Sequence, residues 1–165
     1  MQTTLILGIG NTLLTDEGVG VHVLKFLQRH YTYDNNVTLL DGGTLSLTLA
    51  ADIEDHDQLI VMDAANLGKT AGAVRCMEGE DMDAFLGASR RSVHQVGLLD
   101  LIDIARLTNS LPVHRALIGI QPQTVDWGEQ PTPTVRKAIP TAASLAIDLL
   151  ARWQQPACDL AKVLP

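Results

Sequence analysis

Residues 5–20 of the chain read LILGIGNTLLTDEGVG. The first three letters form an uninterrupted apolar run typical of a buried strand, and the Gly8–Asn11 segment that follows is typical of a turn. From residue 18 to residue 30 the apolar positions recur at helical spacing, and Thr15 or Asp16 is expected to cap that helix. A buried strand, a turn and an amphipathic helix form the first half of a βαβ unit, so this segment predicts an open α/β sheet.

The same alternation of apolar runs and amphipathic stretches continues along the chain. The expected strands are 37–40, 59–62 and 115–120, and the expected helices are 45–51, 97–107 and 133–153. The segment 65–72 is too short for a helical crossover, so residues 73–77 are expected to enter the sheet antiparallel. The elements together predict a three-layer α/β/α sandwich with a mainly parallel five-stranded sheet and one antiparallel strand.

Several helix boundaries carry recognisable signals. Thr44 is expected to cap the helix at 45–51. Thr132 is expected to cap the last helix, with Pro133 at its first position. Pro140 falls within that last helix, so we expect it either to kink the helix or to restart it.

The composition is typical of a single domain. Of 165 residues, 46% are hydrophobic, and 12 Lys and Arg against 19 Asp and Glu give a net charge of −7. That charge disfavours binding to nucleic acids and to anionic membranes, and no apolar run approaches the ~20 residues of a membrane-spanning helix. The N-terminus lacks the signal-peptide pattern, and Cys76 and Cys158 are expected to be thiols in a reducing compartment. The sequence therefore predicts a soluble cytoplasmic protein.

Four carboxylates follow the first three expected strands. Asp16 and Glu17 come after the first strand, Asp41 after the second and Asp63 after the third. In an open parallel sheet, ligands bind beyond the carboxyl ends of the strands, so these side chains are expected to share one edge. Taken singly, Asp16 and Glu17 are equally compatible with an ordinary helix start. Asp41 and Asp63, taken singly, are better explained as turn or cap residues. Together they would repel one another unless a cation lay among them.

His94 is expected in a polar loop just before a helix, from which its imidazole can reach the same edge. Together, Glu17, Asp63 and His94 offer two carboxylates and one imidazole, which suit a zinc-like or nickel-like ion with an open coordination position. The Gly8–Gly10 pair falls short of a dinucleotide-binding fingerprint because position 13 is Leu. Serine-hydrolase and P-loop motifs are absent from the sequence.

Residues 8–20 resemble the opening signature of the [NiFe]-hydrogenase maturation endopeptidases. Shorter blocks in the same order are similar to the later motifs of that family: Asp41–Thr44, Met62–Ala64, Ser92–Gly97, Gly119–Pro122 and Thr132–Val135. The long first block is specific, and the short blocks gain weight from their shared order. One departure is His22, where several relatives carry arginine.

The resemblance implies that residues 1–165 form one hydrogenase-maturation-peptidase-like domain. It implies an endopeptidase that removes the C-terminal extension of a [NiFe]-hydrogenase large-subunit precursor after nickel insertion, permitting final folding and assembly with the small subunit. The metal-contacting residues of the family fall on Glu17, Asp63 and His94, and its further acidic residues fall on Asp16 and Asp41. The nickel is carried by the precursor, and a surrogate such as zinc or cadmium is expected to fit the same site.

The mechanism stays open between two possibilities. The metal can supply the polarised carbonyl and activated water, or Asp16 and Asp41 can act as a carboxylate pair that shares a proton. Two other functions also remain open: a non-catalytic nucleotide-binding or metal-delivery module, and a general metallo-exopeptidase. In every case we expect no nucleic-acid partner and no membrane insertion.

Overall fold

The computed structural model describes residues 1–88, 93–153 and 158–159, with the backbone alone for 93–96 and 158–159. Its centre is a five-stranded sheet in the order β3-β1-β4-β6-β5. Four strands are parallel, namely β1 (Thr4–Ile9), β3 (Val37–Gly43), β4 (Gln58–Ala64) and β6 (His114–Ile120), and β5 (Val74–Glu78) runs antiparallel to β6. The expected sheet, including its antiparallel strand, is confirmed.

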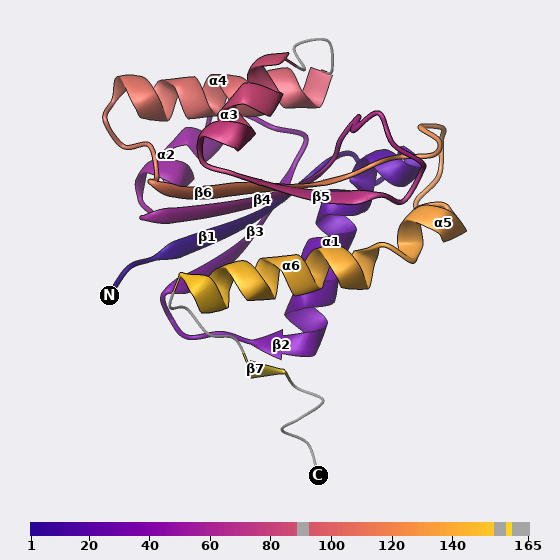
Figure 1. The fold of residues 1–165 in the computed structure, drawn as a ribbon, viewed down its shortest axis with the longest axis horizontal. Helices are drawn as coiled ribbons and strands as arrows, with labels where there is room; N and C mark the ends of the chain where they lie inside the picture. Colours follow the sequence, from indigo (N-terminus) through magenta and orange to yellow (C-terminus); the bar gives the residue numbers. More distant parts are fainter. Residues whose placement is uncertain (89–92, 154–157, 160–165) are drawn as a thin grey trace.

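Helices cover both faces of the sheet (Figure 1). One face carries α1 (Val19–His30) and α6 (Ile139–Arg152), and the other carries α2 (Leu49–Glu54), α3 (Glu80–Ala88) and α4 (Val93–Leu107). The shorter elements are the 3₁₀ turn η1 (Thr15–Gly18), α5 (Pro133–Arg136), and the strand pair β2 (Tyr31–Thr32) and β7 (Cys158–Asp159). The three-layer sandwich expected from the sequence is therefore confirmed.

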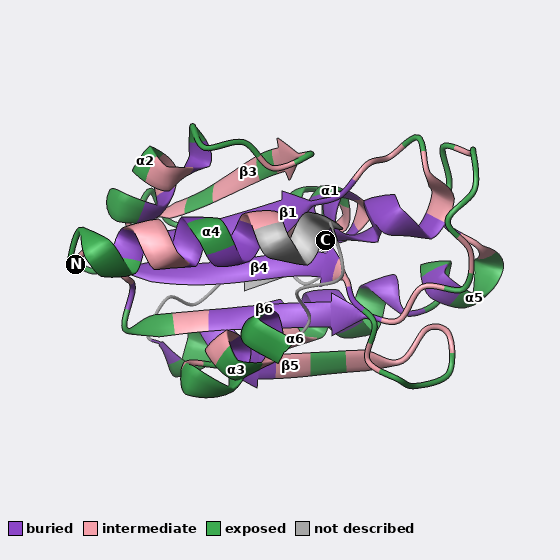
Figure 2. Ribbon diagram, turned by 90° about the horizontal axis from the view of Figure 1, so that it is seen from above, coloured by how far each residue is buried: buried purple, intermediate pink, exposed green. Residues whose placement is uncertain are grey.

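An apolar cluster fills the space on each side of the sheet. Ile6 of β1 belongs to the cluster under α1 and α6, whereas the next residue, Leu7, belongs to the cluster under α2, α3 and α4. Because successive residues of a strand point to opposite faces, an unbroken apolar run serves both clusters at once. All six residues of β1 are buried, and Figure 2 shows β1 and β4 as the buried centre of the sheet.

Two helix starts differ from the expectations. Neither Thr15 nor Asp16 caps α1, because the 3₁₀ turn intervenes and the N-cap is Gly18, without a side-chain cap bond. The second helix begins at Leu49, so Thr44 lies well before it and does not cap it. At the first of these starts the side chains of Thr15 and Asp16 have other partners, because they form hydrogen bonds with residues 123–132.

The expected boundaries of the last helical region are confirmed. The Thr132 hydroxyl accepts a hydrogen bond from the Val135 amide at 3.4 Å, with Pro133 in the first turn of α5. Pro140 restarts the helix, since α6 begins at Ile139 as a separate element. A proline in a first turn removes an amide that would have had no intrahelical acceptor.

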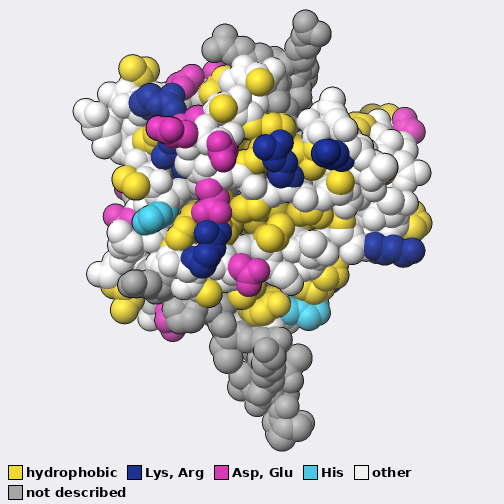
Figure 3. Space-filling model, viewed as in Figure 1, with side chains coloured by type: hydrophobic (Ala, Val, Ile, Leu, Met, Phe, Trp, Pro, Cys, Tyr) yellow, Lys and Arg dark blue, Asp and Glu magenta, His cyan; other side chains and the backbone are white. Residues whose placement is uncertain are grey.

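The surface mixes charged and apolar side chains, as Figure 3 shows for one face. Asp83 forms ion pairs with Arg115 at 2.6 Å and with Arg106 at 3.1 Å, which joins α3 to β6 and α4. None of the described helices combines the length and the apolar character needed to cross a bilayer.

Candidate functional site

Two glycines bring the start of α1 against the carboxyl ends of the central strands. At Gly20, an added Cβ would lie 2.1 Å from the carbonyl oxygen of Met62 and 2.4 Å from that of Ile9. At Gly10, where φ is +131°, an added Cβ would lie 2.0 Å from the carbonyl oxygen of Glu17. Contacts this short exclude any side chain at Gly10 and Gly20. The two glycines therefore allow η1 and the start of α1 to lie close to the ends of β1 and β4.

Asp63 is the most unusual side chain at this edge. Asp63 is the penultimate residue of β4, and only 1% of its surface is exposed. Both carboxylate oxygens are buried without a hydrogen-bond partner among the described residues. Burial raises the pKa of Asp63 well above its ordinary value; the Ala64 amide partly opposes this shift, and the negative charge of Glu17 adds to it. A buried, unpaired carboxylate calls for an explanation in any folded protein.

Glu17 is the charged neighbour of Asp63. It lies in η1, is 8% exposed, and is close enough for its charge to disfavour the ionised form of Asp63. The structure thus brings together two residues that are far apart in the sequence and were predicted as metal ligands. Oxygen atoms of two carboxylates in a dry environment form a donor set that a divalent cation would stabilise.

The third predicted ligand, His94, falls in the first turn of α4 and not in a loop before the helix. Its side chain lies outside the described residues, so its predicted role as a ligand stays a prediction. A Cβ added at Gly97, one turn later, would lie 3.3 Å from Leu45, which follows β3. Within the described side chains, from which His94 is missing, no group of three His, Cys, Asp or Glu residues is suited to hold a metal ion.

Asp16 holds the segment after β6. Its carboxylate is fully buried and accepts four hydrogen bonds. Oδ2 accepts from the amides of Gln123 at 2.9 Å and Thr124 at 3.0 Å, and from the Thr132 hydroxyl at 3.0 Å. Oδ1 accepts from the Thr132 amide at 2.6 Å. This arrangement fixes the segment 123–132 against the 3₁₀ turn.

Asp41 lies apart from the other predicted carboxylates. It is exposed near the end of β3, and its Oδ1 accepts a hydrogen bond from the Gly43 amide at 2.9 Å. It shares a register position with Gly8 and Met62, so strand alternation directs it to the face covered by α1 and α6. Asp63 follows Met62 and points to the opposite face. No hydrogen bond joins Asp41 to Asp16 in the described part of the chain.

The role of the segment 123–132 was not predicted from the sequence. Only the capping role of Thr132 was recognised, whereas the contact between Asp16 and Gln123 spans 107 residues. Thr15 adds to it, since its hydroxyl donates to the Thr124 carbonyl at 2.7 Å. No local sequence pattern predicts these long-range hydrogen bonds, because they depend on two segments meeting at one edge of the sheet.

Sequence comparisons place the chain beside proteins of hydrogenase maturation. The HycI family model, described as hydrogenase maturation protease, matches residues 21–149. The hydrogenase expression/formation protein HupD of Bradyrhizobium diazoefficiens is 42% identical over 150 residues, which cover 90% of this chain and 78% of that protein. The hydrogenase 2 maturation protease of Escherichia coli is 37% identical over 139 residues, or 84% of each chain.

Solved structures show the same similarity. The hydrogenase maturating endopeptidase HybD from Escherichia coli matches with a TM-score of 0.92 and 31% identity, over 97% of this chain and 99% of that chain. The [NiFe] hydrogenase maturation protease HybD from Thermococcus kodakarensis matches with a TM-score of 0.75 and 26% identity, over 89% of this chain and 98% of that chain. The similarity in sequence and the similarity in fold therefore both extend over most of this chain.

Proposed function

The chain belongs to the hydrogenase maturation protease family, and from this membership we propose that it removes the C-terminal extension from the precursor of a [NiFe]-hydrogenase large subunit. The observation that carries the proposal is the Asp63 carboxylate, which is buried without a hydrogen-bond partner beside Glu17 at the ligand-binding edge of the sheet. A buried carboxylate without a hydrogen-bond partner is costly for the protein alone, and a divalent cation that binds it would offset this cost.

In this proposal the cation is nickel that the precursor already carries. Asp63, Glu17 and His94 bind it as part of the substrate, so the enzyme acts only after nickel insertion. A precursor without nickel brings no cation to the buried Asp63 carboxylate and therefore binds weakly. Zinc or cadmium would satisfy the same carboxylate and imidazole donors and would occupy the site as surrogates.

Cleavage requires water to add to the scissile carbonyl carbon and a proton to reach the departing amide nitrogen. Asp41 is an exposed carboxylate near the end of β3, but its side chain points to the sheet face opposite Asp63, so its role in proton transfer stays a prediction. Asp16 already accepts four hydrogen bonds, which supports a positioning role for it. The pairing of Asp16 with Asp41 stays a prediction, and so does a cytoplasmic location.

The test is the incubation of the purified chain with nickel-loaded and nickel-free large-subunit precursor, followed by intact-mass spectrometry. We expect loss of the C-terminal extension from the nickel-loaded precursor only. Asp63→Asn should abolish that loss, whereas Asp148→Asn, a control on an exposed carboxylate of α6, should leave it intact.

Three other results would contradict the proposal. Binding of the precursor without trimming would favour a non-catalytic delivery module. Cleavage of short unstructured peptides in the presence of added metal would favour a general exopeptidase. Equal trimming of nickel-loaded and nickel-free precursor would remove nickel from the recognition step.

A further inference from the structure

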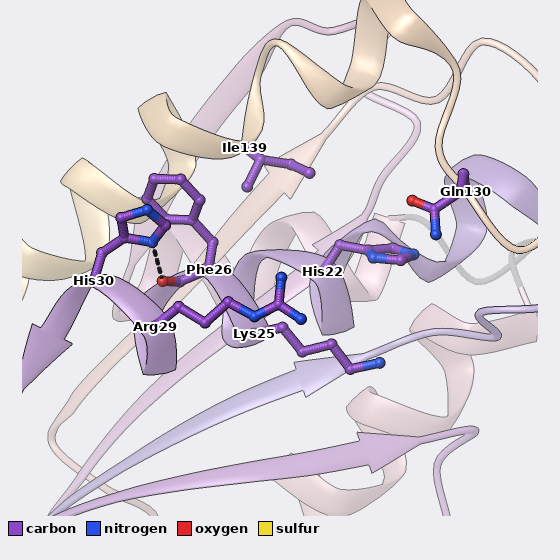
Figure 4. A pocket seen from close by; sticks show the side chains of 7 residues that line it. All are labelled: His22, Lys25, Phe26, Arg29, His30, Gln130 and Ile139. Carbon is purple, nitrogen blue, oxygen red and sulfur yellow. Dashed lines mark hydrogen bonds between the residues drawn. The ribbon is translucent and has the colours of Figure 1, made fainter.

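A pocket lies on the outer side of α1, and Asp63 is not among the residues that line it. Its volume is about 270 Å³, and it is lined by α1, by Gln130 and by Ile139 at the start of α6. Figure 4 shows Lys25 and Arg29 extending from α1 near His22, with Gln130 facing His22 across the pocket. This volume is near the lower limit for small-ligand sites, so the pocket has room for an anionic group and bound water.

Two cationic side chains, Lys25 and Arg29, line this pocket, and none of its lining residues is acidic. Residues 18–33 contain no Asp or Glu, although the chain as a whole has a net charge of −7. Lys25 and Arg29 are four residues apart on one helix face, an arrangement in which like charges destabilise the helix. Neither forms an ion pair with a described residue. By contrast, Arg115 and Arg152 are each paired with a carboxylate, Asp83 and Glu78.

His22 gives an independent sign that a ligand is missing. Its Nε2 atom is buried and has no hydrogen-bond partner among the described residues. Burial lowers the pKa of His22, and the positive charges of Lys25 and Arg136 lower it further. A hydrogen bond between the ring and the Glu129 backbone raises the pKa and partly offsets these effects. The ring thus lies in a positive field with one nitrogen lacking a partner, an arrangement that an anion would satisfy.

We propose that the pocket formed by His22, Lys25, Arg29 and Gln130 is an anion-binding site that takes one carboxylate or phosphate group. The guanidinium of Arg29 provides paired N–H donors for two oxygens of such a group, and the ammonium of Lys25 provides a point charge. The imidazole of His22 and the amide of Gln130 complete the site as hydrogen-bond donors. Phe26 and His30, whose rings stack at 3.9 Å, form its far wall.

The anion has two possible sources with the same chemistry. One is a free oxyanion such as inorganic phosphate. The other is an acidic side chain of the precursor, and only this second source rests on the proposed function. Binding of the probe ion and processing of the precursor are therefore measured separately.

The first arm follows amide and imidazole signals of the isotope-labelled full chain by NMR as inorganic phosphate is added at constant ionic strength. We expect saturable shifts confined to residues 22–30 and 129–130 and a rise in the pKa of His22. Lys25→Gln with Arg29→Gln should weaken the apparent affinity at least tenfold. A control with the same change in charge, Lys69→Gln with Arg75→Gln, should bind as the parent does.

Shifts that are equal in all three proteins, or that rise linearly without saturation, would overturn the proposal. An unchanged pKa of His22 at saturating phosphate would also overturn it. This arm does not depend on peptidase activity, so its failure leaves the proposed function untouched.

The second arm identifies the source of the anion. If the pocket binds an acidic group of the precursor, the Lys25 and Arg29 double variant should show a KM raised at least tenfold with kcat unchanged. If KM is unchanged while phosphate binding is lost, the pocket is a site for a free oxyanion. Both results support the anion site established in the first arm.

Discussion

At the scale of single residues, Asp63 is a buried carboxylate whose two oxygens both lack a hydrogen-bond partner among the described residues. Its carboxylate is removed from water and faces the charge of Glu17 without a described hydrogen-bond partner. Residues of this kind reduce stability and persist where they serve a ligand. The same side chain therefore links a measurable property of the free protein to the cation binding that we propose.

The first prediction concerns the pH dependence of stability in the metal-free protein. Unfolded Asp63 ionises near its ordinary pKa of 3.8, whereas folded Asp63 keeps its proton to higher pH. The folded state therefore binds more protons above pH 3.8, and the free energy of unfolding falls as pH rises, by up to about 1.4 kcal/mol per pH unit until the folded pKa is passed.

Urea unfolding of the wild type and Asp63→Asn across this range measures the effect. The other titrating groups are shared by both proteins and cancel in the difference. We expect the variant to become steadily more stable than the wild type as pH rises. Parallel stability curves would show that burial does not shift the Asp63 carboxyl.

The second prediction separates Asp16 from Asp41. Asp16→Asn places an amide nitrogen among backbone N–H donors, so we expect a loss of about 3 kcal/mol in stability. That loss corresponds to a Tm lower by roughly 6–12 °C for a chain of this size. Asp41→Asn affects an exposed side chain and should leave Tm within about 1 °C.

Processing assays of the same two variants complete this test. Slow cleavage by Asp41→Asn at normal Tm would support a role in proton transfer. Full activity in both variants would eliminate every mechanism in which these two carboxylates handle protons.

At the scale of elements, the site depends on how closely α1 approaches β1 and β4. The contact is made by backbone, since Gly20 leaves no room for even a methyl group beside the carbonyl oxygens of Met62 and Ile9. The turn that carries Glu17 ends where α1 begins, so a shift of the helix would move Glu17 relative to Asp63.

The third prediction is that Gly20→Ala lowers stability by about 3 kcal/mol or more, because backbone atoms must move to relieve the contact. Gly87→Ala is the matched control, since Gly87 is exposed in α3 and an added Cβ meets nothing within 4 Å. We expect the control to gain up to about 1 kcal/mol from helix propensity. Equal unfolding midpoints for the two variants would contradict the close packing of α1.

The elements themselves were largely predictable. Apolar runs identified β1, β4 and β6, most of whose residues are buried. The strand β3 lies at the edge of the sheet and has no fully buried residue, and the shorter run of residues 37–40 identified it. The 3₁₀ turn at Thr15–Gly18 and the late start of α2 were not predicted. The 3₁₀ turn is held by hydrogen bonds to the distant segment 124–132, which hydrophobic periodicity does not record.

At the scale of the whole molecule, the sheet brings residues from separate sequence motifs to one of its edges. Parallel strands place Glu17 and Asp63 together, which the order of the strands was sufficient to predict. The divergence of Asp41 from Asp63 follows from strand register, and the anchoring role of Asp16 follows from the path of residues 123–132. Neither was visible without the folded chain.

The most direct test of the account is anomalous X-ray scattering from crystals of the chain soaked in Ni²⁺. We predict one strong peak about 2.0–2.2 Å from carboxylate oxygens of Glu17 and Asp63 and from an imidazole nitrogen of His94, the distances expected for carboxylate and imidazole ligands of such an ion. Nickel bound elsewhere, with the Asp63 carboxylate still unliganded, would contradict the central claim.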